Sequence, residues 1–235
     1  MNMKKSALLA FAVLSTLFLT GCRHAAPASS AESAPEEVMG VRTGDLLFVS
    51  IPIDYDIVDK SYEATAEEMN VIHVVILEVD SAMVWTTDAT IAYGVDRHPL
   101  DTFLTQFSLR DGTLPRLDVM RLDDAHAEAA SRAVEASRQY LGAAYDTDFS
   151  LDNDRYYCSE LVQLVYTDND GKPLFPVCDL EYTSSSGEII PYWTQIFHLI
   201  GHDIPTGPGV MPCNQLRSPL LHPVEHSLYG NRPHI

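Results

Sequence analysis

Cys158 is the residue whose type and position most directly suggest chemistry. It begins an apolar segment, residues 158–166, that follows the polar stretch SLDNDRYY and is typical of a short buried helix. Free N–H groups and the dipole at a helix N-terminus stabilise an anion, so a thiol there ionises below the pKa of ~8.5 of a free cysteine. This position favours a nucleophile, although most unpaired cysteines are small buried hydrophobic side chains.

A thiolate nucleophile needs a base and a group that orients the base. His73 lies in VIHVVILEV, residues 71–79, which is the strongest strand pattern in the chain and places the other odd-numbered positions on its face. If residues 80–81 form a two-residue turn, Asp88 lies directly opposite His73, with Cβ atoms ~5 Å apart. Asp-Ser is not a favoured turn, and a three-residue turn would place Ala89 there instead. Without that pairing, His73 is a core histidine and Asp88 a solvated loop acid.

The elements that position these residues are strands followed by helices. Strands are predicted at residues 46–51, 71–79, 83–87, 91–95 and 117–122. One helix is predicted from Asp124 to Gly142, with Ala127, Ala130, Val134 and Leu141 near one face, and another at 158–166. Residues 54–70 read as loop with some helix, and the loop-rich end of the chain has one apolar stretch near 192–200. Strands and then helices, without regular alternation, predict an α+β fold with an antiparallel sheet.

Other histidines and cysteines give weaker patterns. Two histidine pairs have a spacing of four and could form a zinc site with Cys213 or Asp203: His198 with His202, and His222 with His226. Neither pair is part of an HExxH motif, so we predict surface or packing histidines, no metal site and no cofactor. Cys178 and Cys213 could form a disulfide in an exported protein, which would leave Cys158 as a free thiol.

The N-terminus has the pattern of an export signal. Lys4 and Lys5 precede an apolar run that is shorter than the ~20 residues of a spanning helix. The ending Leu-Thr-Gly-Cys22 resembles a bacterial lipobox, in which the signal is cut before a cysteine that carries lipid; an ordinary signal peptide is the alternative. We predict a lipoprotein signal at 1–21, a flexible Ala-, Ser-, Pro- and Glu-rich linker at 22–40, and one domain at 41–235.

Composition narrows the classes of partner. The 235 residues include 33 acidic and 15 basic side chains, for a formal net charge of −18. Such a chain repels phosphate backbones and anionic headgroups, so we predict no nucleic-acid partner and membrane contact only through the N-terminal lipid. A hydrophobic content of 46% with 20% charged residues excludes a disordered chain and a multi-pass membrane protein. Oligomeric state is left open.

Three segments resemble a known family. They are GDLLFV at 44–49, HVVILEVD at 73–80 and YLGAAYDTDFSLDNDRYYCSELVQLVY at 140–166. Together they are similar to the circularly permuted branch of the NlpC-type papain-like cysteine hydrolases, in particular the YiiX/YebB-like group; lecithin retinol acyltransferase is a more distant permuted relative. The most specific element is Gly-x-x-Tyr-Asp followed by Tyr-Cys-Ser-Glu-Leu. In this branch the histidine strand precedes the cysteine helix, which is the order seen here.

The resemblance implies a papain-like α+β fold with a small antiparallel sheet or barrel packed against helices, including the one that bears Cys158. Carried over by position, Cys158 matches the nucleophile and His73 the general base. Asp88 stands where relatives often carry Glu, and this departure leaves Asp96 or a backbone carbonyl as alternatives for the third role.

Neighbouring motif residues are further candidates for substrate or oxyanion contact. Tyr157 is adjacent to the nucleophile, but it could equally be an aromatic plug on the sheet. Glu160 could bind a substrate amine, although we favour a capping role in the first turn of the helix. Tyr145 belongs to the same motif. The backbone N–H of Cys158 is expected to help stabilise the oxyanion.

The function expected from this resemblance is hydrolysis of an amide bond through a thioester on Cys158. The enzyme would be exported and lipid-anchored in a bacterial cell envelope, and it would cut cell-wall peptide or a similar small peptide or amine-bearing substrate. Two alternatives remain: a lipid-directed thiol acyltransferase or thioesterase, and a catalytically inactive binding lipoprotein of the same fold.

Overall fold

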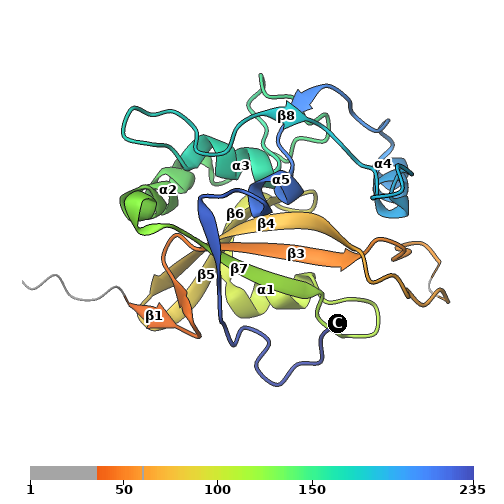
Figure 1. The fold of residues 1–235 in the computed structure, drawn as a ribbon, viewed down its shortest axis with the longest axis horizontal. Coiled ribbons are helices and arrows are strands. Elements are labelled where there is room, and N and C mark those ends of the chain that lie inside the picture. The colour runs from red at the N-terminus through yellow and green to blue at the C-terminus, as the bar shows by residue number, and fades with distance from the viewer. Residues whose placement is uncertain (1–35, 60) are drawn as a thin grey trace, which may run out of the picture. The chain divides into compact units, whose positions relative to one another are not determined.

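The computed structural model describes residues 36–59 and 61–235. The predicted signal at 1–21, including the run that ends before Cys22, and linker residues 22–35 lie outside the described residues. The centre of the described part is a six-stranded antiparallel sheet with strand order β10-β7-β3-β4-β5-β6 (Figure 1). The fold is α+β, as predicted.

The sheet strands are β3 (Leu46–Pro52), β4 (Met69–Asp80), β5 (Met83–Thr90), β6 (Gly94–Pro99), β7 (Arg116–Leu122) and β10 (Leu221–Val224). Two short pairs lie outside it: β1 (Glu37–Val38) with β2 (Val41–Arg42), and β8 (Cys178–Asp179) with β9 (Pro208–Gly209). The helices are α1 (Leu100–Gln106), α2 (Ala127–Ser137), α3 (Cys158–Val165), α4 (Pro191–Ile200) and α5 (Pro212–Leu216), and single 3-10 turns at Asp124–His126 and Arg138–Tyr140 flank α2. Within the described residues, no helix is both long and apolar enough to cross a bilayer.

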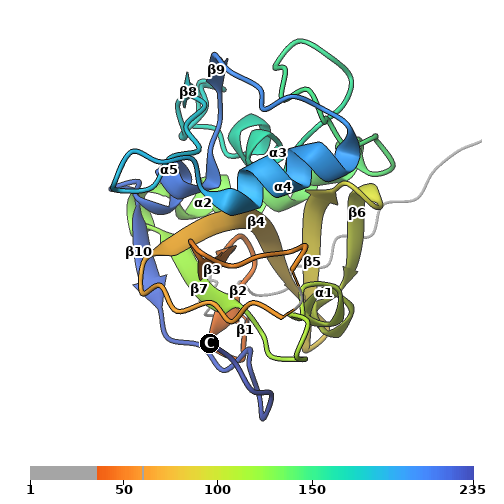
Figure 2. The same ribbon diagram turned by 90° about the vertical axis from the view of Figure 1, so that its right-hand side faces the viewer.

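An apolar core covers each face of the sheet, because successive side chains of a strand point to opposite sides. On one face, Leu46 and Phe48 belong to a buried cluster shared with α2 and α3. On the other face, Leu47 and Leu77 pack with Phe103 of α1. In Figure 1, α2, α3 and α5 lie above the sheet and α1 below it, and Figure 2 shows α4 on the same side as α3. Since both faces are covered, the central strands read as nearly continuous apolar runs.

A β-bulge in β4 changes which residues share a face with His73. Val49 of β3 pairs with His73, but the next residue, Ser50, pairs with Val71, so Ile72 is an extra residue on β4. The sequence placed Val71 on the face of His73. That prediction is wrong, because the extra residue reverses the alternation and Val71 packs in the cluster on the α3 side.

The turn between β4 and β5 lies one residue later than predicted. Ser81 and Ala82 form it, with φ values of 55° and 62°, the left-handed conformation that a tight hairpin turn requires. As a result Val79 pairs with Val84 instead of Ala82, a register shift of two residues. Because the side-chain period of a strand is two, the shift moves Asp88 along the strand but keeps it on the face of His73.

Several other boundaries also differ from prediction. β1 lies within the predicted linker 22–40, where its hairpin with β2 is closed by an Arg42–Glu37 ion pair of 2.8 Å, so order begins before residue 41. The predicted strand 91–95 is mostly a turn, and β6 begins at Gly94. The predicted long helix ends as α2 at Ser137, which leaves Leu141 off its apolar face and exposed. The described residues 54–59 and 61–68 contain no helix, and α1, α5 and β10 were not predicted.

Candidate active site

A buried imidazole–carboxylate pair joins the two central strands β4 and β5. His73 Nε2 lies 2.6 Å from Asp88 Oδ2, and the two residues are 6% and 1% exposed. The sequence predicted this pair as directly opposed residues; the observed register makes it a diagonal pair on one face, within reach of an imidazole ring. The second carboxylate oxygen, Asp88 Oδ1, has no hydrogen-bond partner among the described residues.

Cys158 lies at the first residue of α3, as predicted, and its thiol faces the same imidazole. It is 5% exposed and lines the same cavity as His73, close enough that the imidazole and the backbone N–H of Val74 both favour the ionised form of its thiol. Since Nε2 of His73 is bound to Asp88, the ring nitrogen that remains for Cys158 is Nδ1. The thiol, the imidazole and the carboxylate therefore come from α3, β4 and β5 in turn, with a hydrogen bond between the last two and the thiol beside the imidazole in the same cavity.

Electrostatics among these three groups favour a thiolate beside an imidazolium. Burial alone would disfavour the charged ring, but the charge of Cys158 and the hydrogen bonds to Asp88 and Cys158 raise the pKa of His73 from 6.5 to about 10. Burial likewise opposes ionisation of Cys158, yet the nearby charge and hydrogen bond of His73, with the Val74 N–H, lower the pKa of the thiol. Each charged group stabilises the other in a site from which water is largely excluded.

Phe107 stacks on the imidazole. Its ring lies 4.6 Å from the ring of His73 with an interplanar angle of 28°, and Phe103 stacks behind it at 4.5 Å. Phe107 is the residue that ends α1, where its N–H bonds to the carbonyl of Phe103. The stack limits rotation of the imidazole.

Tyr157 and Glu160 have structural contacts. Tyr157 is fully buried, stacks on Phe149 at 4.4 Å, and its hydroxyl accepts a hydrogen bond from Val210 N–H at 2.9 Å. Tyr157 thus packs in the aromatic cluster beside α4 and not on the sheet, unlike the plug that the sequence suggested. Glu160 accepts a 3.4 Å hydrogen bond from the N–H of Tyr157, as a first-turn cap does. Burial raises the pKa of Glu160 to about 8. The negative charge of Asp146 also raises this pKa, whereas the hydrogen bond from Tyr157 lowers it.

A cavity of about 120 Å³ opens beside the thiol and imidazole. Its polar lining comes from Cys158, His73, Ser159, Thr90, Tyr145 and Tyr192. The rest is apolar and comes mainly from α4 and the loop before α5: Ile72, Ala89, Ile91, Phe107, Phe149, Trp193, Ile196, Phe197, Ile200, Met211 and Pro212. Apart from the ionisable pair itself, no charged side chain lines it. Burial, together with the charge of Cys158, raises the pKa of both Tyr145 and Tyr192, so their hydroxyls stay protonated.

Residues considered as alternatives lie elsewhere or are otherwise engaged. Asp96 pairs across from Asp88 but is 54% exposed at its side chain and lies 3.7 Å from His98, not against His73. Cys178 and Cys213, which the sequence allowed to pair, are separate thiols. His202 lies 3.4 Å from Asp148, and within residues 36–59 and 61–235 no group of three or more His, Cys, Asp or Glu is arranged to bind a metal ion.

Sequence reasoning missed Phe107 and the α4 wall of the cavity. Residues 100, 103, 104 and 107 are apolar at helical spacing, which is a usable signal for α1, but the run is short and follows a proline. The apolar stretch near 192–200 was noticed, and the structure shows it as α4, which ends at Gly201 with φ 74°. Nothing local indicated that it covers the site.

Comparison with known proteins gives two findings. A family model described as "Permuted papain-like amidase enzyme, YaeF/YiiX, C92 family" matches residues 40–174, more than half of the chain. The crystal structure of metalloprotein YiiX from Escherichia coli O157:H7 is similar, with a TM-score of 0.56 and 23% sequence identity over 80% of this chain and 98% of that chain. At this identity the likeness concerns the fold. No curated protein matches the chain.

Proposed function

Because the chain belongs to the YaeF/YiiX family of permuted papain-like amidases, it is a cysteine amidase or peptidase, and we propose that Cys158, His73 and Asp88 carry its reaction. The observation that supports these roles is the hydrogen bond between imidazole and carboxylate, with the thiol beside the imidazole at the wall of the apolar cavity. Asp88 orients the ring, His73 holds the proton and Cys158 supplies the nucleophile.

In the first half of the reaction the Cys158 thiolate attacks the carbonyl carbon of the amide. A carbon–sulfur bond forms and the carbonyl oxygen becomes an oxyanion. The N–H of Cys158 stands at the N-terminus of α3, where the free amide and the helix dipole stabilise that negative charge. His73 then donates its proton to the amide nitrogen, the carbon–nitrogen bond breaks, and the amine leaves a thioester on Cys158.

In the second half water replaces the amine. His73, now neutral, takes a proton from a water molecule as that water attacks the thioester carbonyl. The carbon–sulfur bond breaks, the acid is released, and the thiolate–imidazolium pair is restored. These steps use the side chains of Cys158 and His73, the backbone N–H of Cys158 and water.

The substrate we propose is a small peptide or peptide-like amide with an apolar group next to the bond that is cut. Burial of such a group in the cavity contributes roughly 25 cal/mol of binding free energy per Å² of apolar surface removed from water. Among the described residues, the cavity lining has no charged side chain besides Cys158 and His73, so an apolar group does not separate any other charge from water. Cell-wall peptide is the proposed natural source. Export through residues 1–21 and a lipid on Cys22 would hold the enzyme near it, with the following residues as a tether.

A second candidate is supported by the same apolar lining. A fatty acyl ester or thioester would place its chain against Ile196 and Ile200 and would transfer the acyl group to Cys158 without an amine to protonate. The two candidates differ in the leaving group, so a matched pair of substrates separates them.

The experiment uses hexanoyl-aminomethylcoumarin, an amide, beside the hexanoyl ester of the corresponding hydroxycoumarin. We expect release of aminomethylcoumarin, a hexanoyl adduct on the peptide that contains Cys158 in intact and digest mass spectra, and loss of both in Cys158→Ala. Cys178→Ala and Cys213→Ala are the matched controls and should keep both. Turnover of the amide by Cys158→Ala would overturn the nucleophile assignment, and turnover of the ester alone would favour the second candidate.

A further inference from the structure

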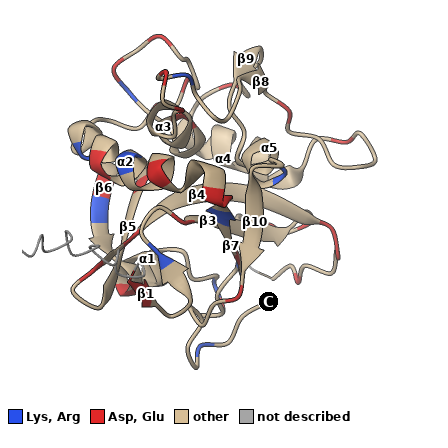
Figure 3. Ribbon diagram, turned by 60° about the vertical axis from the view of Figure 1, so that its left-hand side comes forward, with Lys and Arg blue, Asp and Glu red and all other residues tan. Residues whose placement is uncertain are grey.

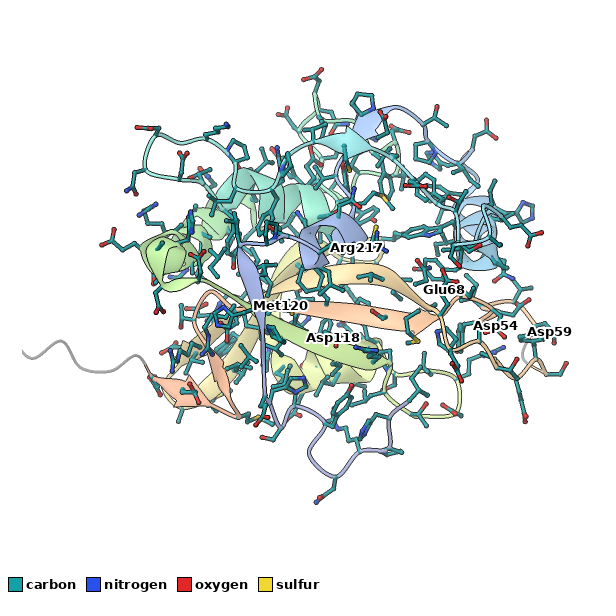
Figure 4. All side chains as sticks on the ribbon, in the orientation of Figure 1. Asp54, Asp59, Glu68, Asp118, Met120 and Arg217 are labelled. Atoms are coloured by element: carbon teal, nitrogen blue, oxygen red, sulfur yellow. The ribbon has the colours of Figure 1, made fainter. Side chains whose placement is uncertain are left out.

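A second cavity of about 250 Å³ lies beside the apolar one and shares Trp193 and Met211 as a wall. Its floor includes Val71 and Ile190, which are buried. Its polar lining comes from the start of β4, the loop after β8 and the residue that follows α5: Glu68, Asn70, Glu181, Thr183, Ser184, Ser185 and Arg217. We call it the polar cleft. Arg217 and Glu68 are labelled in Figure 4.

Arg217 differs from the other arginines of the described residues. Each of the others has a carboxylate or carbonyl partner for its guanidinium, as Arg121 has in Asp45 and Arg232 in Asp101. In the part of the chain that the structure describes, the Arg217 guanidinium has no such partner. In a chain with a net charge of −18, an arginine without an acid beside it is unusual. Arg217 is exposed and is one of the residues that line the cleft, and its guanidinium carries five donors.

Asn70 is a second residue of the cleft lining with a donor that is unpartnered in the described part of the chain, and this donor atom, Nδ2, is itself buried. Its side chain lines the cleft, the residue is only 6% exposed, and its Nδ2 has no hydrogen bond within the described residues. A buried amide normally finds a partner, because leaving it unsatisfied costs roughly 1–3 kcal/mol. An amide group can turn about its last bond, so the same side chain can present its N–H groups to the cleft.

The acids of the cleft already have donors. Glu68 accepts hydrogen bonds from the N–H and the hydroxyl of Ser185, at 2.9 and 2.6 Å. These bonds lower the pKa of Glu68, although burial raises it. Glu181 accepts one from the hydroxyl of Thr183 at 3.1 Å. The groups that remain without partners are therefore donors, and one of them is charged. A bidentate acceptor of negative charge satisfies them best, and in a peptide that acceptor is a carboxylate.

We propose that the polar cleft binds a carboxylate of the substrate, on the part of the substrate that does not enter the apolar cavity. The inference rests on the proposed amide hydrolysis and specifies its substrate class. Because Ile72 is an extra residue on β4, Asn70 and His73 pair with Ile51 and Val49, which are two residues apart on β3 and correspond to about 7 Å along a strand. An extended peptide covers that distance in about two residues. The preferred substrate is thus a short acylated peptide with a free carboxylate at its far end.

The test measures binding first, in the full chain carrying Cys158→Ala, so that the ligand survives. The ligands are N-hexanoyl-Ala-Ala-Ala with a free C-terminal carboxylate and the same compound as its C-terminal amide, each titrated by calorimetry. The acid should bind about tenfold more tightly, as expected for a charge-assisted hydrogen bond at a partly exposed site. Adding Arg217→Gln should remove that preference. Arg232→Gln, which changes an exposed arginine outside the cleft, should retain it.

Asn70→Ala provides a second, smaller test. It should weaken binding of the acid a few-fold, and a thermal melt shows whether the variant is folded. Equal affinity of acid and amide, or a preference that persists in Arg217→Gln, would overturn the carboxylate site.

Turnover of the same two compounds by the unmodified enzyme separates this inference from the proposed function. If the acid binds preferentially but neither compound is turned over, the carboxylate site in the polar cleft is supported and the proposed amide hydrolysis is rejected. Turnover of both at equal kcat/KM would support the hydrolysis and reject the cleft.

Discussion

Two buried carboxylates on neighbouring strands, Glu78 of β4 and Asp88 of β5, differ in how completely they are bonded. Glu78 is 8% exposed, and each of its oxygens accepts from an arginine: Oε2 from Arg97 at 2.8 Å and Oε1 from Arg138 at 2.7 Å. Arg97 also stacks over Trp85 at 4.0 Å. Asp88 is more deeply buried, yet one oxygen is bound to His73 and the other has no partner within the described residues.

The difference separates a structural cluster from the one that we propose to be reactive. Glu78 joins β4 to β6 and to the turn after α2, and a fully bonded buried acid of this kind rigidifies the elements it connects. Within the described residues, the hydrogen-bond partner of the Asp88 carboxylate is a ring that can gain and lose a proton, and that ring lies beside a thiol. Incomplete bonding at a buried acid is costly and is expected mainly where function requires it.

The sharpest test of this comparison is Asp88→Ala. Without its carboxylate the His73 ring loses its orientation and a hydrogen bond that favours the imidazolium. We expect kcat/KM for the amide substrate to fall about 10²-fold, mostly in kcat, while the melting temperature changes by no more than a few degrees. Stopped assays beside a thermal melt measure both.

Asp96→Ala is the matched control, because Asp96 is the neighbouring acid on β6 and is exposed. Its activity should stay near that of the unmodified enzyme. An unchanged rate in Asp88→Ala, or a loss as large in Asp96→Ala, would transfer the orienting role away from Asp88.

Glu78→Gln should have the opposite pattern. The substitution leaves two arginines without a buried anion, but both reach solvent, with side chains 22% and 46% exposed, so the loss is smaller than for a fully buried pair. We expect about 1–2 kcal/mol less stability toward denaturant and an unchanged kcat/KM. A large loss of activity in a variant that remains folded would show that the two clusters are coupled.

The sequence predicted more of the reactive cluster than of its surroundings. Strand alternation put His73 and Asp88 on one face although the turn was placed one residue too early, because an error of two in register preserves the face. The helix at Cys158 followed from its apolar run. The bulge at Ile72 has no local signal, and the presence of Asn70 and Arg217 in the lining of one cleft depends on contacts between segments far apart in the chain. Local sequence periodicity is thus enough to predict the residues proposed for catalysis, whereas the residues that wall the cavity and the cleft are set by tertiary packing.

The smallest expected effect tests whether the aromatic stack belongs to the reactive cluster. Activity needs the imidazolium of His73, so kcat/KM should fall as pH rises through about 10, where that ring loses its proton. Phe107→Leu removes an aromatic ring that lies 4.6 Å from the imidazolium, and this cation–π interaction contributes about 0.5–1 kcal/mol. The pKa of His73 should therefore fall, and the alkaline limb of the pH–rate profile should move to lower pH by about half a unit.

Phe103→Leu is the control, because the ring of Phe103 is 6.3 Å from that of His73 and wholly buried. This substitution should lower stability and leave the alkaline limb in place. The alkaline limb is read from pH–rate profiles or from the NMR titration of His73. If it is the same in the unmodified enzyme and in Phe107→Leu, Phe107 only lines the cavity and does not affect the ionisation of His73. A shifted limb would extend the reactive cluster from β4 and β5 to the end of α1.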